Sequence, residues 1–191
     1  MTTFMGMYTK FGNAKLGKSV ASVNRPAIDT CPGASETCKG ICYALKNLYK
    51  ALKIQDKYAA STINLPEKLP ALVRIHASGD FDSTEYVQFW INTVKANTGT
   101  KFWGYTRSWQ AKTGLLPSLE QLRAEPNVQL FASMDDSITE SPPAGWRVAY
   151  ISPDARFKGM KCLEQEGKMS DCKACGYCFK KTRGNVEFMP H

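Results

Sequence analysis

The sequence of 191 residues contains no run of about eighteen consecutive apolar residues, which is the minimum for a transmembrane helix. Its first residues, MTTFMGMYTK, lack the charged and then apolar pattern of a secretory signal peptide. It also has no internal repeat, no low-complexity segment and no long linker. These absences predict a cytoplasmic protein with no membrane partner, folded as a single domain over residues 1–191.

Histidine is scarce, because the chain has only His76 and the terminal His191. Catalysis by histidine therefore has one internal candidate. A single histidine at the end of a strand is more often a hydrogen-bonded structural residue than a catalytic base, and we expect that role for His76.

Cysteine is absent between Tyr43 and Met160, and the seven cysteines fall into two groups on either side of this gap. An odd number argues against complete disulfide pairing. In a reducing cytoplasm, clustered cysteines indicate metal binding rather than disulfides.

The C-terminal group contains CKACGYC, an overlapping C-x2-C-x2-C pattern. Zinc sites generally use separated C-x2-C pairs, whereas overlapping spacing is typical of ferredoxin loops that hold a 4Fe–4S cluster. The fourth ferredoxin cysteine is missing downstream, but an upstream cysteine can replace it. The pattern favours iron–sulfur over zinc, with Cys162, Cys172, Cys175 and Cys178 as the ligands.

The N-terminal group, Cys31, Cys38 and Cys42, lies in a loop rich in glycine and proline. Three thiolates on a four-iron cluster leave one iron open to a substrate or cofactor, as catalytic zinc sites keep an open position. Alternatively, a cysteine of the other group completes a single closed cluster. The sequence leaves open whether there are one or two 4Fe–4S clusters.

The charge is basic, with 25 Lys and Arg against 17 Asp and Glu. Such an excess favours binding of nucleic acid or of an anionic small molecule, and it also occurs on ordinary solvated surfaces. One alternative is therefore a zinc-stabilised nucleic-acid binder, although a lysine stripe is usually just the solvated face of a helix. Its basic residues would be Lys46, Lys50, Lys53 and Lys57 on one helix, with Lys173, Lys180, Lys181 and Arg183 around the C-terminal cysteines.

Strands and helices alternate through the middle of the chain, which predicts an α/β fold with parallel strands. The chain is short for a complete eight-fold barrel, so we expect four or five strands in a partial (β/α) barrel or an open parallel sheet. Asp82 and Glu85 have the pattern of a helix-capping box. The expected strands are 71–77, 101–106, 127–133 and 146–152, and the expected helices are 45–60, 82–96 and 117–125. This α/β core, 45–156, would lie between a cysteine-rich loop, 29–44, and a cysteine-rich C-terminal segment, 157–191.

Polar residues follow all four expected strands, in HASGDF, YTRSW, SMDDS and SPDAR. Ligands of parallel α/β folds bind at the carboxyl ends of the strands, so four such ends together predict a lined pocket. The alternative for each single residue is a turn or a helix cap, because Asp and Ser favour both.

The segments TCPGASETCKGICYA, RIHASGDF, YTRSW and CKACGYC resemble the cysteine-rich bacteriophage proteins related to gene product 88. That family is itself similar to radical S-adenosylmethionine enzymes. The resemblance implies that the Cys31, Cys38 and Cys42 loop holds an open 4Fe–4S cluster, and that Asp80 holds the amino group of S-adenosylmethionine. The implied cofactor-binding residues are Ser78, Gly79, Asp80, Tyr105, Arg107, Ser133 and Asp135.

Two iron–sulfur functions follow from this resemblance. The first is a minimal radical S-adenosylmethionine enzyme with a small-molecule cofactor. The second is a non-enzymatic electron carrier, redox sensor or regulator of a host protein, with a fully ligated cluster and no adjacent pocket. Either would act in the host cytoplasm.

Overall fold

The computed structural model describes residues 6–45, 53, 56–61, 65–181 and 184–190. Its centre is an eight-stranded sheet with the order β1-β2-β3-β4-β5-β6-β8-β7. Among the described strands only the β1–β2 pairing is antiparallel, and the sheet is open because β1 and β7 form its two edges. The strands are β1 Tyr8–Phe11, β2 Ala21–Asn24, β3 Leu72–Ile75, β4 Lys101–Thr106, β5 Val128–Met134, β6 Arg147–Ile151, β7 Gly159–Lys161 and β8 Asn185–Phe188.

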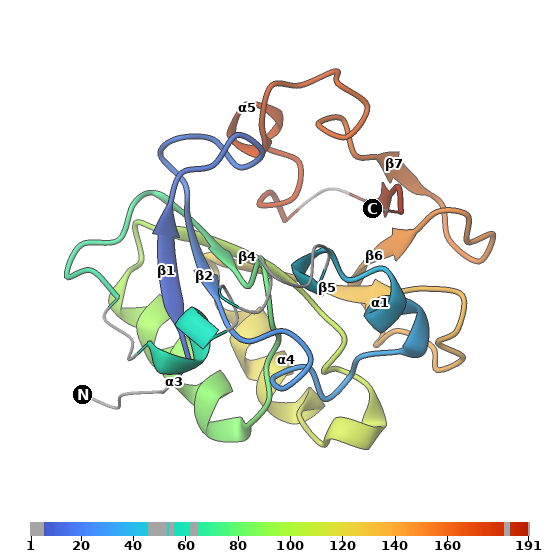
Figure 1. Ribbon diagram of the computed structural model, residues 1–191, viewed down its shortest axis with the longest axis horizontal. Helices are drawn as coiled ribbons and strands as arrows, with labels where there is room; N and C mark the ends of the chain where they lie inside the picture. Colours follow the sequence, from blue (N-terminus) through green and yellow to red (C-terminus); the bar gives the residue numbers. More distant parts are fainter. Residues whose placement is uncertain (1–5, 46–52, 54–55, 62–64, 182–183, 191) are drawn as a thin grey trace.

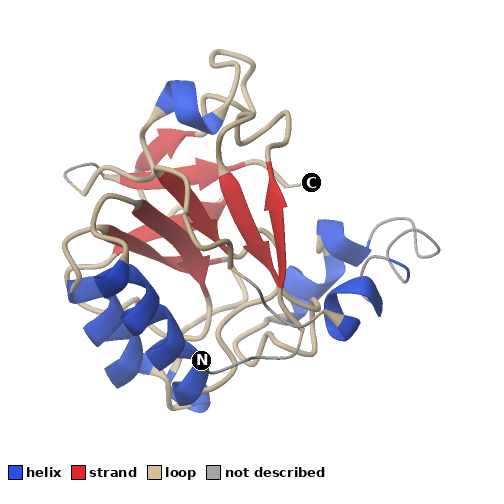
Figure 2. Cartoon of the chain, turned by 90° about the vertical axis from the view of Figure 1, so that its left-hand side faces the viewer, coloured by secondary structure: helices blue, strands red, loops and turns tan. Residues whose placement is uncertain are grey.

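Two longer helices, α3 and α4, cover one face of this sheet, and the shorter helices lie in loops (Figures 1 and 2). The helix α3 buries a stripe of side chains that includes Tyr86, Trp90 and Val94, at the spacing of one helical face. The helices are α1 Glu36–Gly40, α3 Thr84–Ala96, α4 Leu116–Ala124 and α5 Cys172–Cys175, with short 3₁₀ turns η1 Tyr43–Leu45 and η2 Ala111–Thr113.

The sequence predictions for this fold are confirmed in their main elements. The α/β class and the four central strands agree with the structure, as do the helices α3 and α4. The strand count is wrong, because β1, β2, β7 and β8 also belong to the sheet, which therefore extends on both sides of the expected core, 45–156. The expected helix 45–60 lies largely outside the described residues.

The predicted cap of α3 needs a correction. Ser83 is the N-cap, and its hydroxyl accepts a hydrogen bond from the Tyr86 backbone N–H at 3.2 Å. Asp82 instead forms an ion pair with the buried Arg25. The two residues are adjacent and both suit an N-cap, so the sequence pattern could not separate them.

The opposite face of the sheet is covered by the C-terminal segment. Side chains alternate along a strand, so Phe102 of β4 packs with the helices, while Trp103 packs with Cys172 and Cys178. Figure 1 shows α5 and the loop between β1 and β2 together, on the side of the sheet away from α3 and α4. The cysteine-rich C-terminus is therefore part of the packed core of this face.

Candidate functional site

A cavity of about 210 Å³ lies at the carboxyl ends of the parallel strands. Loops after β2 and β3 form part of its wall, and residues at the ends of β4, β5, β6 and β8 form another part. Lys15, between β1 and β2, and Arg74, in β3, complete it. The structure thus brings together the N-terminal cysteine loop and most of the predicted cofactor residues. Those that line the cavity are Cys31, Cys38, Cys42, Ser78, Gly79, Tyr105, Arg107 and Ser133.

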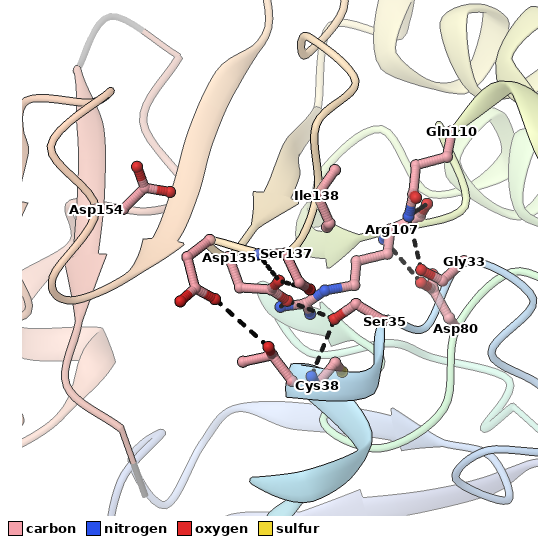
Figure 3. Close-up of polar contacts among 12 residues, drawn as sticks. Gly33, Ser35, Cys38, Asp80, Arg107, Gln110, Asp135, Ser137, Ile138 and Asp154 are labelled. Carbon is pink, nitrogen blue, oxygen red and sulfur yellow. Dashed lines mark hydrogen bonds and ion pairs between the residues drawn. The ribbon is translucent and has the colours of Figure 1, made fainter.

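The cysteine loop is held in place by contacts with the ends of β4 and β5 (Figure 3). Ser35 begins the short helix α1 by accepting a hydrogen bond from the Cys38 backbone N–H at 3.0 Å, and its hydroxyl donates to Asp135 Oδ2 at 2.6 Å. Gln110 Nε2 donates to the Gly33 carbonyl at 2.6 Å. The position of the thiols is therefore fixed by residues about seventy to a hundred positions later in the chain.

Asp135 does not line the cavity but positions residues that do. It is 1% exposed, and its Oδ2 lies 3.0 Å from Arg107 Nη2. Burial alone would raise the pKa of Asp135, but hydrogen bonds from Ser137 and Ser35 and the charge of Arg107 lower it below the usual value. Asp135 is therefore an ionised anchor that joins the cysteine loop to Arg107.

Asp80 is also buried and is not among the lining residues. Its carboxylate accepts hydrogen bonds from the backbone N–H groups of Phe81 and Arg107, both at 2.8 Å, and burial raises its pKa. The alternative that Asp80 caps α3 is wrong, because Ser83 does so. The structure gives Asp80 the role of joining the ends of β3 and β4, and contact with a cofactor stays a prediction.

Gly79 lets the turn after β3 approach the chain after β2. Its φ of +79° is rarely adopted by other residues, and a Cβ there would lie 2.6 Å from Arg25 Cβ and 2.7 Å from Thr30 Oγ1. The SGD turn is consequently packed directly against the segment that leads into the cysteine loop.

The three N-terminal thiols influence one another electrostatically. Burial, with smaller contributions from the nearby Asp80, Cys38 and Cys42, raises the pKa of Cys31 to about 12. Burial also raises the pKa of Cys38. A positive centre beside Cys31 and Cys38, such as a metal cluster, would favour their ionisation.

The donor set suits a cluster better than a single ion. Within the described residues, no three His, Cys, Asp or Glu side chains are placed to hold one metal ion. A four-iron cluster takes one thiolate per iron, so its ligands stand apart around it. Cys31, Cys38 and Cys42 all line the cavity, so these three residues would hold such a cluster there.

The C-terminal cysteines gather on the sheet face opposite α3 and α4. Cys172 and Cys178 pack near Trp103, and Cys162 and Cys178 pack near Phe131. Burial and the neighbouring thiols raise the pKa of Cys172 to about 12 and that of Cys178 to about 11. None of this group is among the residues that line the cavity.

Tyr105 lies between the two cysteine groups. It lines the cavity of the N-terminal thiols, and the interaction of its hydroxyl with Cys178 lowers the pKa of that thiol. The two groups are therefore separate sites on one sheet, joined by this side chain of β4.

His76 is a neutral residue of the interior, as expected. Its ring nitrogen Nε2 is 2.8 Å from the Tyr86 hydroxyl. Burial, together with the charges of Arg25 and Arg74, lowers its pKa well below the usual 6.5. A role as a structural hydrogen-bonding group agrees with these contacts.

Sequence reasoning missed two cations that line the cavity, Lys15 and Arg74. Arg74 could have been identified from the sequence, because it interrupts the strand LVRI with a charge. Strands buried on both faces are otherwise nearly continuous apolar runs. Lys15 lies between β1 and β2, two strands that the sequence did not reveal.

Fold and site together define an α/β protein with a cysteine-lined cavity at the carboxyl edge of a mostly parallel sheet. Comparison with known proteins shows that the chain belongs to the gene product 88 family, whose family model, described as Gene product 88, matches residues 62–181. The Gene 88 protein of Mycobacterium phage L5 is 30% identical over 94% of this chain and 90% of its own length. That of Mycobacterium phage D29 is 28% identical over 89% of this chain and 87% of its own length.

No solved structure matches the chain. Neither the family description nor the two relatives' names mention S-adenosylmethionine, so the likeness to radical enzymes stays a prediction. In the described part of the chain, no helix has both the length and the apolar character needed to span a bilayer.

Proposed function

We propose that this protein is an iron–sulfur protein in which Cys31, Cys38 and Cys42 hold a 4Fe–4S cluster whose fourth iron faces the cavity. The observation that carries the proposal is that all three cysteines line one cavity at the carboxyl ends of the parallel strands. When bound, such a cluster supplies one electron at a time and an open iron for a ligand.

A closed zinc site is a poorer explanation of the same residues. Structural zinc needs four close ligands, and the described residues offer no such group.

The four C-terminal cysteines form a second, closed cluster in this proposal. Cys162, Cys172 and Cys178 influence one another electrostatically, and Cys175 ends the same short helix that Cys172 begins. Cys38 and Cys42 raise the pKa of Cys31, and Cys42 raises that of Cys38, so the N-terminal thiols lie within electrostatic reach of one another. Two clusters therefore account for all seven cysteines.

A cofactor that binds beside the open iron is favoured over a simple electron carrier. A fully ligated electron carrier has no need for a pocket beside its cluster, whereas this cavity borders the three thiols directly. S-adenosylmethionine is the candidate, because the cysteine loop and the SGD turn follow the neighbouring parallel strands β2 and β3. Ser78 and Gly79 of this turn line the cavity, where the polar end of the cofactor would lie.

The two cysteine groups provide matched variants for a test. The triple variant Cys31→Ala, Cys38→Ala and Cys42→Ala should lose about half of the iron and acid-labile sulfide of the anaerobically reconstituted protein and should no longer bind S-adenosylmethionine in calorimetry. Cys178→Ala should lose the other half of the iron and acid-labile sulfide and should still bind S-adenosylmethionine. Unchanged iron in the triple variant would show that the loop carries no ligands.

A further inference from the structure

The charges around the cavity are all of one sign. Lys15, Arg74 and Arg107 line it, and none of its described lining residues is Asp or Glu. A concave surface with this balance attracts anions.

Two of these three cations already have carboxylate partners. Arg107 Nη2 lies 3.0 Å from Asp135 Oδ2, and Lys15 Nζ lies 3.3 Å from Glu164 Oε2. Arg74 has no ion pair with any described residue. It therefore contributes the one lining charge that the described part of the protein leaves uncompensated.

Arg74 is nevertheless held in a fixed orientation. Its Nε donates to the His76 carbonyl at 3.2 Å, and its guanidinium carbon lies 4.9 Å from the centre of the Tyr105 ring. The two Nη nitrogens have no hydrogen-bond partner within the described residues. A guanidinium with its plane fixed and its terminal nitrogens free presents the paired donors that a carboxylate or phosphate accepts.

We infer that the cavity binds a small molecule through a carboxylate or phosphate group, and that the Nη nitrogens of Arg74 hold this group. The inference rests on the proposed function in placing the ligand beside the open iron, and it adds the chemical class of the ligand and its anchor. Held on β3, the anionic end would lie among Tyr105, Ser133 and the N-terminal thiols.

The competing role for Arg74 is that of a counter-charge for the C-terminal cysteines. The charge of Arg74 lowers the pKa of both Cys172 and Cys178. In that role Arg74 would tune the reduction potential of the C-terminal cluster without binding any ligand.

The test compares Arg74→Gln, which removes the charge, with Arg74→Lys, which keeps the charge but not the paired donors. The control is Arg123→Gln, because Arg123 lies on α4, pairs with Glu120 at 3.0 Å and does not line the cavity. Each anaerobically reconstituted protein is titrated calorimetrically with inorganic phosphate and with succinate, and its iron, sulfide and reduction potential are measured.

The wild-type protein should bind one of the two anions with a stoichiometry of one, and the preferred anion distinguishes a phosphate ligand from a carboxylate ligand. Arg74→Gln should bind it at least about tenfold more weakly, the change expected for loss of a charged hydrogen bond. Arg74→Lys should bind the anion with intermediate affinity, and Arg123→Gln should bind it as tightly as the wild-type protein does.

Three results would overturn the inference: no binding of either anion by the wild-type protein, equal binding by Arg74→Gln, or a shift in reduction potential as the sole effect of Arg74→Gln. Anion binding that depends on Arg74 in a protein without sulfide would support the inference and refute the proposed cluster. Intact clusters without anion binding would support the proposed cluster and refute the inference.

Discussion

Gly33 allows the cysteine loop to touch the end of β4, so Gly33→Ala should disturb the cluster site. A Cβ on Gly33 would overlap with the Arg107 carbonyl and would lie 2.9 Å from the Ser108 nitrogen. Cβ atoms in proteins essentially never have contacts shorter than 3.0 Å. The loop and the strand end would have to separate by roughly 1 Å, which a packed region resists. The separation would also stretch the 2.6 Å hydrogen bond from Gln110 to the Gly33 carbonyl.

Overpacking of this kind typically costs about 1–3 kcal/mol, so the free energy of unfolding should fall by that amount. For a protein of this size, 1 kcal/mol corresponds to about 2–4 °C in Tm, which gives an expected fall of roughly 2–12 °C. Because Cys31 is two residues away, the iron content after reconstitution should fall as well. Circular dichroism during heating and an iron assay would measure the two effects.

Gly40→Ala is the matched control for this change. Gly40 lies in the same loop, and a Cβ there would meet nothing within 4 Å. Alanine favours helix over glycine by up to about 1 kcal/mol, so this variant should be as stable as the wild type or slightly more so. A Gly33→Ala protein whose Tm and iron content both match those of Gly40→Ala would refute the described packing of the loop.

Two further predictions concern the interior of the sheet. Burial lowers the pKa of His76 below its usual 6.5, so as the pH falls the unfolded chain takes up this proton before the folded chain does. The free energy of unfolding should therefore decrease as the pH falls below about 6.5, by up to about 1.4 kcal/mol per pH unit. Urea unfolding should show a weaker dependence on pH for His76→Asn than for the wild type, and equal dependences would contradict the assignment. Tyr105→Phe removes the hydroxyl that lowers the pKa of Cys178, so redox titration should give a more negative reduction potential with unchanged iron content. Tyr177→Phe, whose hydroxyl donates to the Asn185 carbonyl at 3.1 Å, should leave the potential unchanged.

The central strands could be predicted because each is a run of apolar and aromatic residues between turn residues. KFWGYT and NVQLFAS have this pattern, and they agree with β4 and β5. The missed strands are three or four residues long, and ASVN in β2 and GMK in β7 contain few strongly apolar residues. They are strands because their neighbours pair with them, which local sequence does not encode.

The site was predictable from the rule that parallel strands expose their carboxyl ends together. From that rule the cysteine loop, Ser78, Tyr105 and Ser133 are expected to line one pocket, and the structure places all of them around one cavity. It could not show where a carboxylate points. Asp80 and Asp135 lie at the expected strand ends, but their oxygens bind backbone N–H groups and the side chains of neighbouring loops. An aspartate that joins loops and one that binds a ligand have the same sequence pattern.

The most direct test of the account is the metal and sulfide content of the wild-type protein after anaerobic reconstitution. Two 4Fe–4S clusters predict about eight iron atoms and about eight acid-labile sulfides per chain, with a broad absorption band in the visible region. Zinc in stoichiometric amount without acid-labile sulfide would contradict the iron–sulfur assignment.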